Sequence, residues 1–176
     1  MSEPADPTRP AAPPSEPGTA PPKASIDRVA ADARRLGLAI EIRRMDASTR
    51  TAAEAATACG CDVAQIVKSL VFGSGEGLLL LLVSGAHNAD LAAVAARIGR
   101  PLERCDARRV REVTGFAIGG VAPIGHLTHL PVVMDEALLA HSVVWCAAGR
   151  PDSVFSVAPE ALRDALGAEV VSVVAG

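Results

Sequence analysis

Aromatic residues are nearly missing from this sequence, which has three Phe, one Trp and no Tyr. Proteins that bind single-stranded nucleic acid without sequence preference stack successive bases on aromatic side chains, so this class is not expected. The formal charge of −3 also argues against a protein that follows a phosphate backbone over a long distance, because such proteins need a basic stripe. Hydrophobic residues nevertheless make up 49% of the chain, which is enough for an aliphatic core.

Long hydrophobic runs are missing as well. The longest, Leu78–Val83, has the length of a β-strand and is far shorter than the ~18 residues of a membrane-spanning helix. The N-terminus lacks the basic region and apolar stretch of a signal peptide. We therefore expect the four cysteines to be reduced thiols, and the spacing of Cys59 and Cys61 does not fit a structural zinc site. These features predict a cytoplasmic protein with no membrane contact, metal or cofactor.

The composition changes sharply along the chain. Residues 1–24 contain most of the thirteen prolines and no apolar periodicity, so they cannot bury enough surface to offset the entropy lost on ordering. We predict that they form a disordered tail. Residues 25–176 have the length and composition of one globular domain.

Hydrophobic periodicity and capping residues predict interleaved helices and strands. We expect a helix from its cap at Ser25 to Gly37, and strands over Leu38–Ile42, Ile66–Phe72 and the wholly apolar Leu78–Val83. Further helices are expected after Thr51, after either Asn88 or Asp90, after Asp106 and from Pro159. Further strands are expected over 132–134, 143–146, 153–157 and 170–174. The absence of a strict β-α-β repeat indicates a mixed α/β fold, with helices packed around a mixed sheet.

Lysine is rare, and the predicted domain contains a single one, Lys68, beside many arginines. Its position in an apolar strand predicts that the stem of the side chain is partly buried. A lone ammonium in a chain that otherwise uses Arg suggests a site that needs a compact charge rather than a planar guanidinium. The alternative is a lysine at a strand edge whose ammonium simply reaches water.

A glycine-rich segment, Gly115–Gly125, is the second candidate site. Adjacent glycines at 119 and 120 allow backbone N–H groups to converge on one point, where they can hold a carboxylate, a phosphate or a developing oxyanion. Pro123 removes one donor and stiffens the loop. The spacing matches neither a dinucleotide-binding fingerprint nor a P-loop, and the alternative is that the segment only turns the chain.

The other titratable residues give weaker signals. His126 and His129 lie three residues apart without a third ligand, so a polar loop surface competes with a metal site. Asp135 could orient a functional group or cap the helical turn that follows it. His87 is expected to bond to its own turn, and Cys146 to pack in the core. No Ser-His-Asp arrangement can be assembled from these residues.

Four ordered motifs resemble the YbaK/EbsC family, the editing domain related to the insertion domain of bacterial prolyl-tRNA synthetases. They are IVKSLVF at 66–72, LLLVSG at 80–85 with Asp90-Leu91, the segment Thr114–Gly125, and the C-terminal set DEAL at 135–138, AGR at 148–150 and VAPEAL at 157–162. The resemblance covers nearly all of residues 25–174.

The resemblance implies a freestanding aminoacyl-tRNA deacylase, which hydrolyses the ester between a wrong amino acid and the terminal adenosine of tRNA. It also implies a central, barrel-like mixed β-sheet surrounded by helices. The implied partners are the acceptor end of tRNA and prolyl-tRNA synthetase. The implied substrate is tRNA-Pro carrying Cys, Ala or another small amino acid.

The resemblance also assigns roles to residues. The strand lysine, here Lys68, is the key residue of the family pattern, and the loop Gly119–Pro123 approaches the aminoacyl group. Attack by water or by a substrate group would give an oxyanion that backbone N–H groups hold and Lys68 balances. The predicted catalytic residues are Lys68, Gly119, Gly120 and Val121. The predicted substrate-binding residues are Ser69, Pro123, Gly125, His126, Asp135 and Gly149.

Two positions bear on the choice of amino acid. Family members that remove alanine carry Asn after the lysine and His on a late strand, where this chain has Ser69 and Cys146. The run of small residues over Cys146–Arg150 is closer to the cysteine-removing branch, and His126 matches neither pattern. The competing hypothesis is a non-catalytic module that uses the same pocket to hold a small molecule or a partner.

Overall fold

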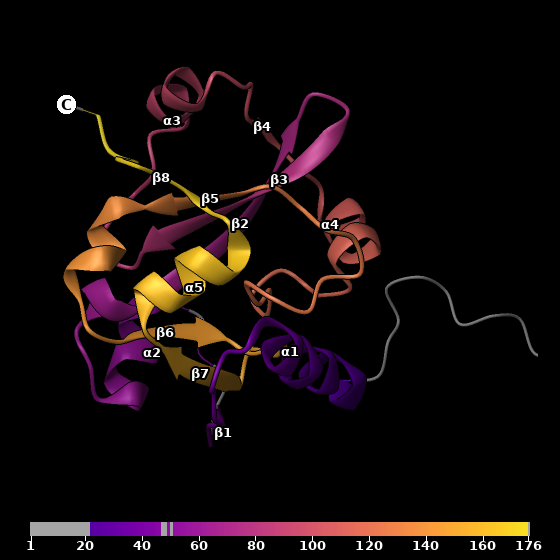
Figure 1. Ribbon diagram of the computed structural model, residues 1–176, viewed down its shortest axis with the longest axis vertical. Helices are drawn as coiled ribbons and strands as arrows, with labels where there is room; N and C mark the ends of the chain where they lie inside the picture. Colours follow the sequence, from indigo (N-terminus) through magenta and orange to yellow (C-terminus); the bar gives the residue numbers. More distant parts are fainter. Residues whose placement is uncertain (1–21, 47–48, 50, 176) are drawn as a thin grey trace, which may run out of the picture.

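The computed structural model describes residues 22–46, 49 and 51–175 (Figure 1). The first helix, α1 (Pro22–Leu36), begins three residues before the predicted cap Ser25. A proline suits the first turn of a helix, where its missing N–H would have no partner and its fixed φ is already helical. Residues 22–24 therefore belong to α1, while the predicted disorder of residues 1–21 lies outside the described residues.

The larger of two β-sheets has five strands in the order β4-β2-β3-β5-β8. They are β2 (Val67–Ser74), β3 (Gly77–Ser84), β4 (Glu103–Arg104), β5 (Val132–Asp135) and β8 (Glu169–Val171). β2 and β3 form an antiparallel hairpin, whereas β5 lies parallel to β3 and β8 parallel to β5. The predicted strand Leu78–Val83 is the central one, as expected for an apolar run without alternation.

The smaller sheet has three strands in the order β1-β7-β6, all antiparallel to their neighbours. They are β1 (Ile42–Arg44), β6 (Val144–Ala147) and β7 (Ser153–Val157). The strand predicted over Leu38–Ile42 was wrong in position, because its apolar residues Leu38 and Ile40 pack into the core as irregular chain and pairing with β7 starts only at Ile42. An isolated bridge between Ile66 and Trp145 links the sheets, which do not close into a barrel within the described residues.

Short helices surround the sheets, and their N-terminal caps follow the sequence prediction. They are α2 (Ala52–Cys59), α3 (Leu91–Ile98), α4 (Ala107–Thr114) and α5 (Pro159–Leu166). The side chains of Thr51, Asp90 and Asp106 each accept a hydrogen bond from the backbone N–H three residues later, as N-cap residues do. No helix in the described part of the chain is both long and apolar enough to cross a membrane.

The core forms on both faces of β3. Leu79, Leu81 and Val83 pack on one side with Val94 of α3, and Leu78, Leu80 and Leu82 pack on the other with residues of α1, α4, α5 and β5–β7. In Figure 1, α3 covers the upper part of the larger sheet, while α1, α2 and the smaller sheet lie below it. The edge of β2 that faces the smaller sheet is thereby left to line a cavity.

Candidate functional site

A cavity of about 400 Å³ lies between β2 of the larger sheet and β6 of the smaller one. Its polar lining consists of Thr49, Thr51, Lys68, Ser69, Arg150 and Ser153. Its apolar lining includes Ile66, Val67, Val71, Val110, Ile118, Val121, Trp145, Cys146 and Val154. A mainly apolar cleft with a few polar groups is the usual form of a small-ligand site, and its volume falls in the common range of ~300–1,000 Å³.

Lys68 lies on β2, and its side chain is half-buried. The ammonium donates a hydrogen bond to the backbone carbonyl of His87, in the turn after β3. Burial lowers the pKa of Lys68 from that of a free lysine, while the negative charge of Asp135 opposes this shift and raises it. The ammonium is therefore held in place from one side, with its remaining N–H groups available to a ligand.

Asp135 ends β5 and has both of the roles that the sequence left open. Its side chain is 1% exposed and accepts hydrogen bonds from the backbone N–H of Ala137 at 3.0 Å, as a cap, and of Ser84 at 3.1 Å. It also accepts one from Nδ1 of His87 at 2.8 Å. Asp135 thus fixes the same turn whose carbonyl holds Lys68, although it does not line the cavity itself.

Ser69 projects from the face of β2 opposite to Lys68, since successive side chains alternate along a strand. Both residues line the cavity because β4 pairs only with Phe72 and Gly73, which leaves the edge of β2 open beside them. The hydroxyl oxygen of Ser69 is buried and makes no hydrogen bond in the described part of the chain. A buried hydroxyl without a partner is costly unless a ligand satisfies it.

The glycine loop brings Gly119 and Val121 to the cavity but not Gly120. The N–H of Gly120 donates to the carbonyl of Ala117 at 3.0 Å, so it cannot also hold an oxyanion in this conformation. The predicted set of three donors is therefore reduced to two, because this tight turn uses the middle N–H. A Cβ at Gly120 would lie 3.1 Å from the Cα of Arg150, so the loop packs directly on the backbone of the opposite rim.

Pro123, Gly125 and His126 do not reach this cavity, contrary to the prediction that they bind substrate there. The segment from Val121 to Ile124 is buried and carries the chain through the core to a second cavity of about 230 Å³, which these three residues line. His126 bonds through Nε2 to the carbonyl of Ala122 at 2.6 Å, and burial lowers the pKa of His126. Burial thus disfavours the charged form of this imidazole, whose hydrogen bond lies within the loop.

Gly149 is also absent from the cavity lining. It adopts a φ of +100°, and a Cβ there would lie 3.1 Å from both the ring of Phe116 and the backbone of Ser25. Its predicted role in substrate binding is thus replaced by close packing beneath the loop. No group of three or more His, Cys, Asp or Glu side chains with the arrangement of a metal site occurs among the described residues.

Two residues of α1 hold the ends of the glycine loop, and sequence reasoning missed both. Arg28 donates to the carbonyls of Gly115 at 2.8 Å and Gly125 at 3.3 Å, and its guanidinium lies 5.0 Å from the centre of the Phe116 ring. Asp32 accepts from the N–H of Gly125 at 2.7 Å. These partners lie about ninety positions away along the chain, so no local pattern marks them.

Replacing Arg28 by Ala is expected to lower the stability of the fold by about 1–3 kcal/mol, because two loop carbonyls lose a charged donor. Arg28→Lys should lose nearly as much, since an ammonium cannot bond both carbonyls and stack on Phe116. Thermal melts and hydrogen exchange of the loop amides measure the effect. Arg34→Ala is the matched control, because Arg34 is exposed on the same helix. Equal melting temperatures for the Arg28 and Arg34 variants would contradict the role of Arg28 in holding the ends of the glycine loop.

Comparison with known proteins places this architecture in a family. A family model for the aminoacyl-tRNA editing domain matches residues 46–165. The uncharacterized protein YwhH of Bacillus subtilis is 30% identical over 126 residues, which cover 70% of this chain and 80% of YwhH. EbsC of Enterococcus faecalis, named as a candidate Cys-tRNA(Pro)/Cys-tRNA(Cys) deacylase, is 27% identical over 64% of this chain and 70% of its own.

A proline–tRNA ligase of Thermosipho melanesiensis is 28% identical over 52% of this chain, which corresponds to only 16% of the ligase. Solved structures show the same fold. A candidate trans-editing enzyme for prolyl-tRNA synthetase superimposes with a TM-score of 0.82 at 44% identity, over 86% of this chain and 98% of its own. The hypothetical protein APE2540 gives 0.77 at 29% identity, over 83% and 98%. The chain therefore belongs to the aminoacyl-tRNA editing domain family, whose mixed α/β fold it shares.

Proposed function

We propose that the protein is a trans-editing deacylase that hydrolyses the ester bond of mischarged aminoacyl-tRNA. The observation that carries the proposal is the cavity lined by Lys68, Gly119 and Val121 in a member of the editing-domain family. The names of EbsC and of the trans-editing structural neighbour support the same reaction class. The acceptor end of tRNA is the proposed partner, and the match to a proline–tRNA ligase favours tRNA-Pro.

In the proposed reaction, the protein stabilises the charge of the oxyanion and does not supply a nucleophile. Water attacks the carbonyl carbon of the ester, and the carbonyl oxygen becomes an oxyanion. The amides of Gly119 and Val121, which have no protein partner in the described part of the chain, together with the Lys68 ammonium, stabilise that charge. The bond to the ribose oxygen then breaks, and this oxygen takes the proton that the attacking water gives up, so that the free amino acid and the tRNA hydroxyl leave.

The lining of the cavity favours a small amino acid. Apolar walls from Ile66, Val121 and Cys146 offer no partner to a charged aminoacyl side chain. Among the buried side-chain nitrogen and oxygen atoms of the described residues, only the hydroxyl of Ser69 lacks a hydrogen bond, and it can bond a thiol, a hydroxyl or an amino group. We propose Cys or Ala on tRNA-Pro as the substrate, with the Ser69 hydroxyl contacting the aminoacyl group.

Ser69→Ala is expected to reduce deacylation about tenfold while leaving stability unchanged or slightly higher. The free protein loses only a buried hydroxyl without a partner, whose removal is favourable or neutral, whereas the complex loses one hydrogen bond, worth ~0.5–1.5 kcal/mol. Single-turnover rates and thermal melts measure the two effects. Ser156→Ala, on β7 and outside the cavity lining, is the control. A melting temperature lowered by Ser69→Ala, with full activity, would assign the hydroxyl to the fold instead.

Incubation with a panel of mischarged tRNAs tests the function itself. We expect ester loss above the buffer rate for tRNA-Pro carrying Cys or Ala, and little for correctly charged Pro-tRNA-Pro. If no aminoacyl ester is lost faster than in buffer, the protein is a non-catalytic module that uses the cavity to hold a small molecule or a partner.

A further inference from the structure

The net charge of the chain conceals a strongly basic segment. Residues 97–111 contain six arginines against Glu103 and Asp106, a local charge of +4 in a chain whose total is −3. Within the described residues, the side chains of Arg100, Arg104 and Arg111 make no hydrogen bond, ion pair or ring contact, and the side chain of Arg34 alone among the other described arginines shares this property. The remaining described arginines bond to carboxylates or carbonyls or lie over aromatic rings. Most of the described arginine side chains without a partner therefore lie in residues 97–111.

Part of this segment lines a groove that the proposed reaction does not use. The groove has a volume of about 480 Å³, and it lies between the β2–β3 hairpin, the end of α3, α4 and the chain leading to β5. We call it the arginine groove. Its polar lining consists of Ser74, Glu76, Arg100, Arg109, Thr128 and His129. Arg109 donates to the backbone carbonyl of Glu76 at 2.9 Å, which fixes its guanidinium against the hairpin.

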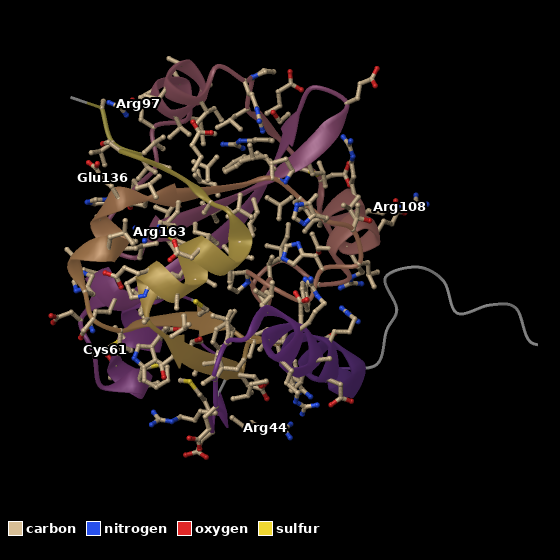
Figure 2. All side chains as sticks on the ribbon, viewed as in Figure 1. Arg44, Cys61, Arg97, Arg108, Glu136 and Arg163 are labelled. Atoms are coloured by element: carbon tan, nitrogen blue, oxygen red, sulfur yellow. The ribbon has the colours of Figure 1, made fainter. Side chains whose placement is uncertain are left out.

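The chemistry of the groove suits a phosphodiester. Two guanidinium groups and the hydroxyls of Ser74 and Thr128 are donors to phosphate oxygens. The only acidic side chain in the lining belongs to Glu76, which is exposed at the tip of the hairpin. Arg108, which projects outward from α4 in Figure 2, is paired with Glu112 at 2.9 Å, whereas Arg111 on the same helix is exposed and unpaired.

α4 connects the arginine groove to the editing cavity. Val110 lines the cavity, and its neighbours Arg109 and Val113 line the groove. The two sites therefore both adjoin α4. An RNA strand whose 3′ end enters the cavity would pass α4 within a few nucleotides.

We propose that the arginine groove and the exposed arginines of α4 bind the phosphate backbone of the tRNA acceptor arm. This inference rests on the proposed function for its ligand, since an editing domain must receive the acceptor end. The short basic surface positions the RNA without reading its sequence. The negative net charge and the lack of aromatic residues argue only against a protein that binds a long stretch of nucleic acid. A short basic surface that contacts a few phosphates is compatible with both features.

The test measures binding to an uncharged acceptor-stem hairpin that ends in CCA, so that no ester is needed. The double variant Arg100→Gln/Arg109→Gln should weaken binding at least tenfold at low ionic strength. The slope of log affinity against log salt should fall by about 0.7–0.9 for each phosphate contact removed. The control is Arg34→Gln/Arg163→Gln, which removes the same charge from α1 and α5, the latter visible away from α4 in Figure 2.

Equal affinity of the groove variant and the control variant would overturn the proposal, as would an unaltered salt slope. Arg100→Glu, which leaves the Arg109 bond to the hairpin intact, keeps the test valid if the double variant melts early, and it should weaken binding further than Arg100→Gln. A short aminoacyl-nucleotide substrate separates this proposal from the proposed function. Groove variants should hydrolyse it at the wild-type rate, whereas failure of the deacylase proposal would show as no hydrolysis by any of the proteins.

Discussion

Lys68→Ala and Lys68→Arg are both expected to lower the rate of deacylation by about a hundredfold, which is the usual effect of removing one oxyanion contact. The alanine variant lacks the charge. The arginine variant keeps the charge but replaces a compact ammonium by a wide planar group on a half-buried strand position. Its guanidinium cannot both bond the His87 carbonyl, as Lys68 does, and occupy the same point in the cavity.

Single-turnover rates on mischarged tRNA, read beside circular dichroism melts, decide the role of Lys68. Both variants should melt close to the wild type, because the Lys68 side chain contributes a single, part-buried hydrogen bond to the fold. Arg44→Ala is a control, since Arg44 is an exposed cation on β1 and does not line the cavity. Full activity in Lys68→Arg would refute the geometric argument, and full activity in Lys68→Ala would remove Lys68 from the mechanism.

Local patterns predicted most of the fold, because the signals are local. The caps at Thr51, Asp90 and Asp106 and the apolar strand at 78–83 each depend on a few adjacent residues, and all appear in the structure. The strand near Ile42 was misplaced because its position depends on pairing with β7, more than a hundred residues away. Closure into a barrel was likewise a matter of long-range geometry, and two bridged sheets form instead.

In the candidate site, too, the sequence predicted the features with a local signal and missed those that depend on long-range packing. Lys68 stood out by its rarity, and the glycine loop by its composition, and both residues 68 and 119 line the cavity. Composition could not show that the turn uses the N–H of Gly120, or that His126 faces a second cavity. The hydrogen bonds from Arg28 to the glycine loop could not be predicted, because its partners are remote in the sequence. The basic groove was hidden because a summed charge of −3 averages over opposite local charges.

Asp135→Ala is expected to destabilise the fold by about 3–5 kcal/mol, which is the size of effect expected when a buried, hydrogen-bonded charge is removed. The carboxylate satisfies two backbone N–H groups and the ring of His87, and truncation leaves all three donors without their partner. Asp135→Asn should lose less, because its carbonyl oxygen can still cap Ala137. Chemical denaturation of both variants measures the loss. Glu136→Gln, at an exposed neighbouring carboxylate, should stay within ~0.5 kcal/mol of the wild type.

Asp135→Asn should also shift the alkaline limit of activity to lower pH, provided that the charged form of Lys68 is the active one. Burial already lowers the pKa of Lys68, and the negative charge of Asp135 counteracts part of that shift. Without this charge, the ammonium loses its proton at a lower pH than in the wild type. Rates from pH 7 upward, corrected for spontaneous ester hydrolysis in buffer, measure the limit. An unchanged limit, together with reduced stability, would mean that Asp135 only braces the turn at Ser84 and His87. A downward shift, absent in Glu136→Gln, would show that Asp135 also sets the charge of Lys68 in the cavity.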